Sequence, residues 1–101
     1  MKRVNVLTFP GCPNHRPTVD LIREVAHDLR VDVELREVGV LNLEEAARLR
    51  FLGSPTVQIE GADIEPRRRE DAEYAITCRI YGTSGIPSRE LVASALVEPA
   101  P

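Results

Sequence analysis

The chain has no long apolar run and no excess of basic residues, and these absences exclude two broad classes of function. No stretch comes near the roughly 20 consecutive apolar residues that a transmembrane helix needs. Across the 101 residues, 13 Lys and Arg stand against 16 Asp and Glu, which gives a formal net charge of −3. Proteins that bind nucleic acid or an anionic membrane surface ordinarily carry a clear basic excess. We therefore expect neither nucleic acid nor a membrane as a partner.

The first residues also lack the features of a secretory signal. Lys2 and Arg3 form a basic pair, but no long apolar stretch follows them. We therefore expect a cytoplasmic protein. A chain of this length fits one small domain with a modest core. The expected boundaries are 1–97 for the domain and 98–101 for a frayed C-terminal tail.

Cysteine is scarce, because only Cys12 and Cys78 are present. Two cysteines allow at most one intramolecular disulfide, and in a reducing cytosol such a bond is more often transient than structural. Their wide separation does not fit a zinc site, which uses close pairs such as CxxC. We predict neither a resident metal nor a cofactor. The oligomeric state is left open.

Apolar periodicity predicts the order strand, helix, strand, helix, strand, strand, helix. The expected strands are 2–9, 31–36, 56–60 and 63–64, and the expected helices begin near Asn14, at Asn42 and after Ser88. A turn is expected at Gly61-Ala62, and 65–87 is predicted to be irregular. The strand–helix–strand opening implies a right-handed parallel crossover, and the hairpin adds antiparallel strands. The fold class is therefore α/β, with a mixed four-stranded sheet and helices on both faces.

Residue choice predicts where two of the helices begin and end. Asn42 is a good N-cap, and Glu45 completes a capping box, while Gly53 is placed to stop the same helix. Pro17 would interrupt a helix that began at Cys12, so regular helix is expected to begin near Asn14.

The sharpest local motif is Gly11-Cys12-Pro13-Asn14-His15, at the junction between the first strand and the first helix. Unpaired backbone N–H groups and the positive end of a helix dipole favour thiolate over thiol there. The thiolate is the form that attacks disulfides or binds soft metals. Because the helix begins near Asn14, we expect Cys12 to lie in a looser turn with a weaker field. The alternative is a partly buried cysteine that simply ends a strand.

His15 occupies the position at which a dithiol motif has its second cysteine. Cys12 therefore has no local resolving thiol. His15 is a candidate base towards Cys12 or a group that orients substrate, although the helix dipole disfavours an imidazolium. The alternative is a surface histidine.

Gly53-Ser54-Pro55-Thr56 is a second candidate motif, because a cis proline before a strand exposes the backbone of the preceding residue to a peptide or thiol adduct. Only about 5–6% of X–Pro bonds are cis, so an ordinary turn proline is the alternative. Cys78 shares its parity with Ile76 and Ile80, which makes it either a small interior hydrophobe or a functional thiol. The positive charge of the three arginines at 67–69 is balanced by nearby carboxylates, and the run is interpreted as a solvated loop.

The cysteine at the first strand–helix junction, the Ser-Pro-Thr before the third strand and the element order together resemble the thioredoxin superfamily, near its small glutaredoxin-like members. The resemblance spans most of the chain. Three stretches are similar to small bacterial thioredoxin-like proteins, some of which are labelled alkylmercury-lyase-like. They are GCPN at 11–14, RFLGSPTV at 50–57 and CRIY at 78–81. The resemblance implies a thioredoxin-like βαβαββα fold.

The resemblance also implies roles for these residues. Cys12 would be the nucleophilic cysteine, and Pro55 the cis-proline beside it. Ser54 would offer its backbone to substrate. The predicted catalytic set is Cys12, His15 and Cys78, and the predicted substrate-binding set is Pro13, Ser54, Pro55 and Thr56.

Three functions are compatible with the resemblance. The leading hypothesis is monothiol exchange with a thiol or disulfide substrate, in which glutathione or Cys78 resolves the mixed disulfide. The second is soft-metal or organomercurial binding or cleavage by Cys12 and Cys78, although no acidic residue lies three positions after Cys12. The third is a non-catalytic binding module that keeps the fold.

Overall fold

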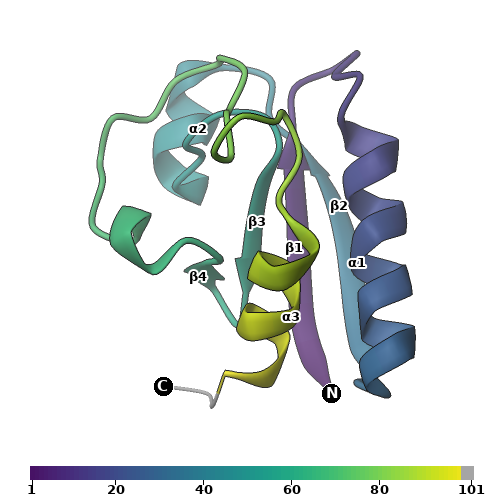
Figure 1. Cartoon of the computed structure of the whole chain (residues 1–101). Coiled ribbons are helices and arrows are strands. Elements are labelled where there is room, and N and C mark those ends of the chain that lie inside the picture. Colours follow the sequence, from purple (N-terminus) through teal and green to yellow (C-terminus); the bar gives the residue numbers. More distant parts are fainter. Residues whose placement is uncertain (99–101) are drawn as a thin grey trace.

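The chain alternates strands and helices in its first half and then adds a hairpin, a long excursion and a final helix (Figure 1). The computed structural model describes residues 1–98. Its elements are β1 (Lys2–Thr8), α1 (His15–Leu29), β2 (Val33–Gly39), α2 (Leu43–Leu49), β3 (Thr56–Ile59), β4 (Ala62–Asp63), the 3₁₀ helix η1 (Pro66–Arg68) and α3 (Arg89–Val97). This order and the α/β class agree with the sequence-based prediction.

The four strands form one mixed sheet in the order β2-β1-β3-β4. The central strand β1 runs parallel to β2 and antiparallel to β3, and β4 pairs antiparallel with β3. The parallel pair is joined through α1, which is the crossover that the sequence predicts. The carboxyl ends of β1 and β2 therefore lie at the same edge of the sheet.

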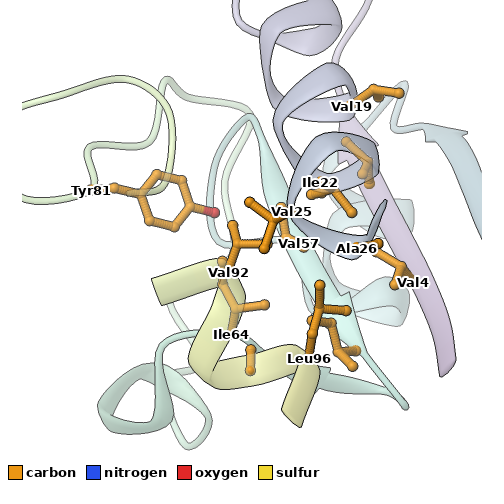
Figure 2. Close-up of a cluster of buried hydrophobic side chains, with 13 residues drawn as sticks. Val4, Val19, Ile22, Val25, Ala26, Val57, Ile64, Tyr81, Val92 and Leu96 are labelled. Atoms are coloured by element: carbon orange, nitrogen blue, oxygen red, sulfur yellow. The ribbon is translucent and has the colours of Figure 1, made fainter. Parts of the chain in front are cut away.

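Helices cover both faces of the sheet. Alternate residues of β1 point to opposite faces, so β1 contributes apolar side chains to a core on each. Val4 and Val6 join α1 and α3 in the larger core, and Figure 2 shows Val25, Val57 and Val92 meeting there with the Tyr81 ring at its edge. Leu7 points the other way and packs with α2. The second core comprises Leu7, Val40, Ala46 and Phe51.

Helix α1 begins at His15, directly after Asn14, as expected. Pro17 then falls in the first turn, where backbone N–H groups have no partner within the helix, so it disrupts nothing. The N-cap of α2 is also as predicted, because Asn42 Oδ1 accepts a 2.8 Å hydrogen bond from the Glu45 N–H.

The predicted end of the second helix at Gly53 is wrong. Helix α2 ends at Leu49, and Arg50 takes a left-handed conformation (φ 58°). The Phe51 N–H then donates to the Ala46 carbonyl, and the Phe51 ring is fully buried. Burying this ring stabilises a tight C-terminal turn that glycine ordinarily supplies.

The hairpin and β2 are each shifted from their predicted positions. The turn lies at Glu60-Gly61, both at positive φ, and β4 is Ala62–Asp63 rather than 63–64. Two-residue hairpin turns of this type require positive φ at both residues, which the predicted Gly61-Ala62 turn would not provide as readily. Strand β2 begins at Val33, because the Val31 N–H still bonds the Ala26 carbonyl at the end of α1.

The chain's C-terminal part is described as far as Glu98. Its carbonyl accepts a 2.6 Å hydrogen bond from Lys2 Nζ, and its carboxylate pairs with Arg69 at 3.0 Å. The rest of the predicted frayed tail, 99–101, lies outside the described residues. Within 1–98, none of the helices has the length and apolar character needed to cross a bilayer.

Candidate functional site

Cys12 lies in the turn that joins β1 to α1. Its N–H donates to the Phe9 carbonyl at 3.3 Å, and its own carbonyl accepts from the His15 N–H at 3.3 Å. It therefore precedes the first regular turn of α1, in the looser position that the sequence predicts. The residue is 9% exposed, and its thiol is free.

An open pocket of about 350 Å³ adjoins Cys12 at the carboxyl ends of β1 and β2. Three of its residues carry groups that can take part in chemistry: Cys12, His15 and Glu37. The remaining lining residues are Thr8, Phe9, Pro10, Gly11, Val38 and Gly39. Ligands in open α/β sheets characteristically bind at this edge, outside the carboxyl ends of the strands.

His15, which lines the pocket, contacts both of the parallel strands. Its Nδ1 lies 2.7 Å from Thr8 Oγ1 at the end of β1, and its Nε2 lies 2.5 Å from Glu37 Oε1 on β2. The Nε2–H tautomer satisfies both contacts, since the Thr8 hydroxyl then donates to Nδ1 and Nε2–H donates to the carboxylate. Both ring nitrogens are thus occupied, and a base role towards Cys12 would require His15 to change partners.

Glu37 is a site residue that sequence reasoning missed. The hydrogen bond from His15 is the main cause that lowers the pKa of Glu37, and the nearby positive charges of a protonated His15 and of Arg16 add to it. Glu37 sits near the carboxyl end of the second predicted strand, and this position is the signal that could have identified it.

The Ser-Pro-Thr motif lies against the same turn as Cys12. The Ser54–Pro55 peptide bond is cis, the geometry that the resemblance implies. Ser54 Oγ accepts a 3.3 Å hydrogen bond from the Phe9 N–H, and Thr56 Oγ1 donates to the Gly53 carbonyl at 2.6 Å. Ser54, Pro55 and Thr56 are all buried.

Residues 77–81, which we call the strap, cover this motif. The Ser54 N–H donates to the Thr77 carbonyl at 2.7 Å, and the Ser54 carbonyl accepts from the Arg79 N–H at 3.0 Å. The Tyr81 hydroxyl donates to the Pro55 carbonyl at 2.6 Å. The backbone of Ser54 is therefore already paired within the chain. A substrate would pair with it only after the strap moved away.

Arg79 anchors the strap in the interior. Its guanidinium donates to both carboxylate oxygens of Asp63 at 2.7 Å and to Glu65 at 2.8 Å. It also lies 4.4 Å from the centroid of the Tyr81 ring, a cation–π contact. Burial alone would lower the pKa of Arg79, but the hydrogen bonds and charge of Asp63 and the hydrogen bond to Glu65 raise it. Burial raises the pKa of Tyr81.

Gly53 allows the strap to approach this closely. A Cβ at Gly53 would lie 3.0 Å from Arg79 Cβ, and the backbone φ of 113° is one that side chains rarely adopt. Both the space and the conformation therefore require glycine.

The interior interpretation of Cys78 is wrong. Ile76, Cys78 and Ile80 are exposed, whereas Arg79 and Tyr81 of the opposite parity are buried. The reason is the carboxylate pair of Asp63 and Glu65, which offsets the cost of burying a charged arginine there.

The two cysteines face different pockets. Cys78 lines a separate pocket of about 570 Å³ that also contains Asp71 and Glu73 and shares no lining residue with the Cys12 pocket. Both thiols are free. The structure thus brings Cys12 and His15 to one pocket and leaves Cys78 outside it. Pro13 lies beside Cys12 in the same turn and is exposed.

The arginine run is balanced by carboxylates, as expected. Arg67 pairs with Glu65, Arg68 with Asp71 and Arg69 with Glu98. Across the part of the chain that the structure describes, no group of three His, Cys, Asp or Glu side chains is arranged to hold a metal ion.

Comparison with protein-family models, with curated proteins and with solved structures finds no match to this chain. Its function must therefore be inferred from its own residues and their geometry.

Proposed function

We propose that the chain is a thioredoxin-like protein in which a single reactive thiol, Cys12, exchanges with disulfides. The observation that carries the proposal is the position of Cys12: a free thiol that lines an open pocket, in the turn that leads into the amino end of α1. The sheet order β2-β1-β3-β4 supports it, as does the Ser54–Pro55 motif hydrogen-bonded to the same turn. The partial positive charge at the start of α1 favours the thiolate.

The exchange runs in two balanced steps. The Cys12 thiolate attacks one sulfur of a disulfide R–S–S–R′, which forms Cys12–S–S–R and releases R′–S⁻, and that thiolate takes a proton from water. A second, external thiol such as glutathione then attacks the sulfur of R. This step yields the mixed disulfide of R with glutathione and returns Cys12 as a thiolate.

Two observations favour an external thiol over an internal one. The position three residues after Cys12 is His15, whose ring nitrogens contact Thr8 and Glu37. Cys78, the other sulfur, lines a different pocket and belongs to a strap held by Arg79.

The two other hypotheses have less support from the structure. Soft-metal or organomercurial handling by Cys12 and Cys78 would need both sulfurs on one atom, and no observation favours it. A non-catalytic binding module makes the opposite prediction for Cys12, because its function would survive Cys12→Ser.

Mass spectrometry of the two cysteine variants tests the proposal. Wild type and Cys78→Ser should form a mixed disulfide at Cys12 with hydroxyethyl disulfide, and Cys12→Ser should form none at that position. Cys78 provides an internal control, because it is the more exposed thiol. If Cys12 is activated, it should be alkylated faster than Cys78 at neutral pH despite its lower exposure. Slower alkylation of Cys12 would contradict the proposal.

A further inference from the structure

On the side of Cys12 towards β3, the backbone groups of Ser54 and Pro55 are already bonded within the chain. Both backbone polar groups of Ser54 and the carbonyl of Pro55 are bonded to the strap. The Ser54 hydroxyl accepts from the Phe9 N–H. A molecule that reaches the Cys12 thiol is therefore recognised mainly by the pocket on the side of β2.

That pocket is small and carries charge of one sign. Its volume of about 350 Å³ lies at the low end of the range for small-molecule sites. Glu37 is the one carboxylate among the described residues that line it, and with His15 neutral its charge has the same sign as that of the Cys12 thiolate. The Glu37 side chain is 38% exposed, so its carboxylate is within reach of a molecule in the pocket.

The carboxylate of Glu37 is held in place and kept ionised. His15 Nε2 contacts this carboxylate, and Thr8 holds the other nitrogen of the His15 ring. The orientation of the Glu37 carboxylate therefore does not depend on a ligand. The ordinary pKa of 4.5 already leaves a glutamate charged at neutral pH, and the pKa of Glu37 is lowered further. Arg16 reaches it only at 3.9 Å, from a side chain that is 66% exposed, and solvent weakens such a pair.

We propose that the pocket beside Cys12 selects small thiols and disulfides that carry a positive charge near sulfur, and that Glu37 is the specificity-determining residue. The inference rests on the proposed exchange at Cys12 and names its substrate class. Two unit charges about 6 Å apart in a water-like medium change a rate by about threefold, so replacing a cationic group by an anionic one changes it by about tenfold.

Three disulfides of matched size test the inference: cystamine, hydroxyethyl disulfide and dithiodipropionate, which differ in a terminal amine, hydroxyl or carboxylate. The rate of mixed-disulfide formation at Cys12 is measured near pH 7 and at low ionic strength in a Cys78→Ser background. We expect cystamine to react about tenfold faster than dithiodipropionate relative to their rates with a free thiol, with hydroxyethyl disulfide between them. Added salt should reduce the ratio.

Matched variants identify the residue responsible. Glu37→Gln keeps an acceptor for His15 but removes the charge, and should reduce the cystamine-to-dithiodipropionate ratio to nearly one. Glu34→Gln removes the same charge from the same strand, outside the pocket and beside Arg36, and should leave the ratio largely intact. Arg16→Gln removes the competing cation and should increase the ratio.

The outcomes separate this inference from the proposed function. Equal relative rates with all three disulfides, or equal effects of Glu37→Gln and Glu34→Gln, would overturn the role of Glu37 and leave exchange at Cys12 standing. A lack of reaction with all three disulfides would overturn the proposed function and the inference together.

Discussion

Ser54 and Cys78 are paired as neighbours in a parallel bridge, through hydrogen bonds from Ser54 to Thr77 and from Arg79 to Ser54. The bridge brings the excursion between β4 and α3 back onto the loop beside Cys12. It also occupies the backbone groups that the resemblance assigns to substrate. The strap thereby keeps the backbone of Ser54 from pairing with a substrate, and its anchor can be tested directly.

Replacing Arg79 with alanine should strongly destabilise the protein. Arg79→Ala leaves Asp63 buried without its cation and leaves Glu65 with only the exposed Arg67, and removing one partner of a buried pair ordinarily costs about 3–5 kcal/mol. We expect urea unfolding to show a loss of about 3 kcal/mol. Arg68→Ala, which removes a more exposed pair with Asp71, should cost less than about 1 kcal/mol. Equal losses would show that Arg79 is no anchor.

Gly53→Ala should destabilise the protein more than Gly61→Ala. Both glycines have positive φ, but a Cβ at Gly61 meets nothing within 4 Å, whereas a Cβ at Gly53 meets Arg79 at 3.0 Å. We expect losses of about 3 kcal/mol for Gly53→Ala and about 1 kcal/mol for Gly61→Ala. Thermal and urea unfolding measure both. A smaller effect at Gly53 would mean that the strap can shift at little cost.

A mixed disulfide formed at Cys12 should persist until an external thiol is added. Because Cys78 lines another pocket, Cys78→Ser should not change the rate at which the adduct is lost. Adding glutathione should then release Cys12 in both proteins. Intact mass spectrometry follows the adduct. Spontaneous loss of the adduct in wild type alone, with an internal disulfide in its place, would instead make Cys78 the resolving thiol.

Acid should weaken the pairing of Glu98 with Arg69. The hydrogen bond from Arg69 is the main cause that lowers the pKa of Glu98 in the folded protein below its ordinary value of 4.5. The pair therefore contributes its full stability above that value, and the contribution is lost as the pH falls through the lower, folded-state pKa. Glu98→Gln should flatten the acid side of the stability profile. Urea midpoints at several acidic pH values test this, with Glu90→Gln on α3 as the control.

Local signals in the sequence predict much of the architecture. The apolar periodicity of β1 and α1, the Asn42 cap and the start of α3 directly after Ser88 each depend on residues close together in the chain, and each is found as predicted. The helix-stopping role of Gly53 failed because a buried Phe51 stabilises a left-handed Arg50 instead. The backbone requirement at Gly53 comes from the strap, which is remote in sequence.

The least predictable part of the site is the strap. Alternation suggests that Ile76, Cys78 and Ile80 face inwards, since apolar side chains ordinarily do so. The observed burial of Arg79 depends on Asp63 and Glu65, whose positions are set by the β3–β4 hairpin. Likewise, the contact of His15 with Glu37 follows from the register of β1 and β2. Pairings of this kind are decided by tertiary structure and leave little trace in local sequence.

The ion pairs of Arg79, which anchor the strap, also determine whether the protein stays assembled after its chain is cleaved. Residues 70–73 are exposed. Arg79, which follows this segment in the chain, is bound to Asp63, which precedes it, and α3 packs against α1. A protease that cleaved within 70–73 would therefore produce two fragments, one carrying Cys12 and the sheet and the other carrying Cys78 and α3. Because the ion pairs and the shared core join these pieces, fragment complementation should restore the assembled molecule from separately made halves.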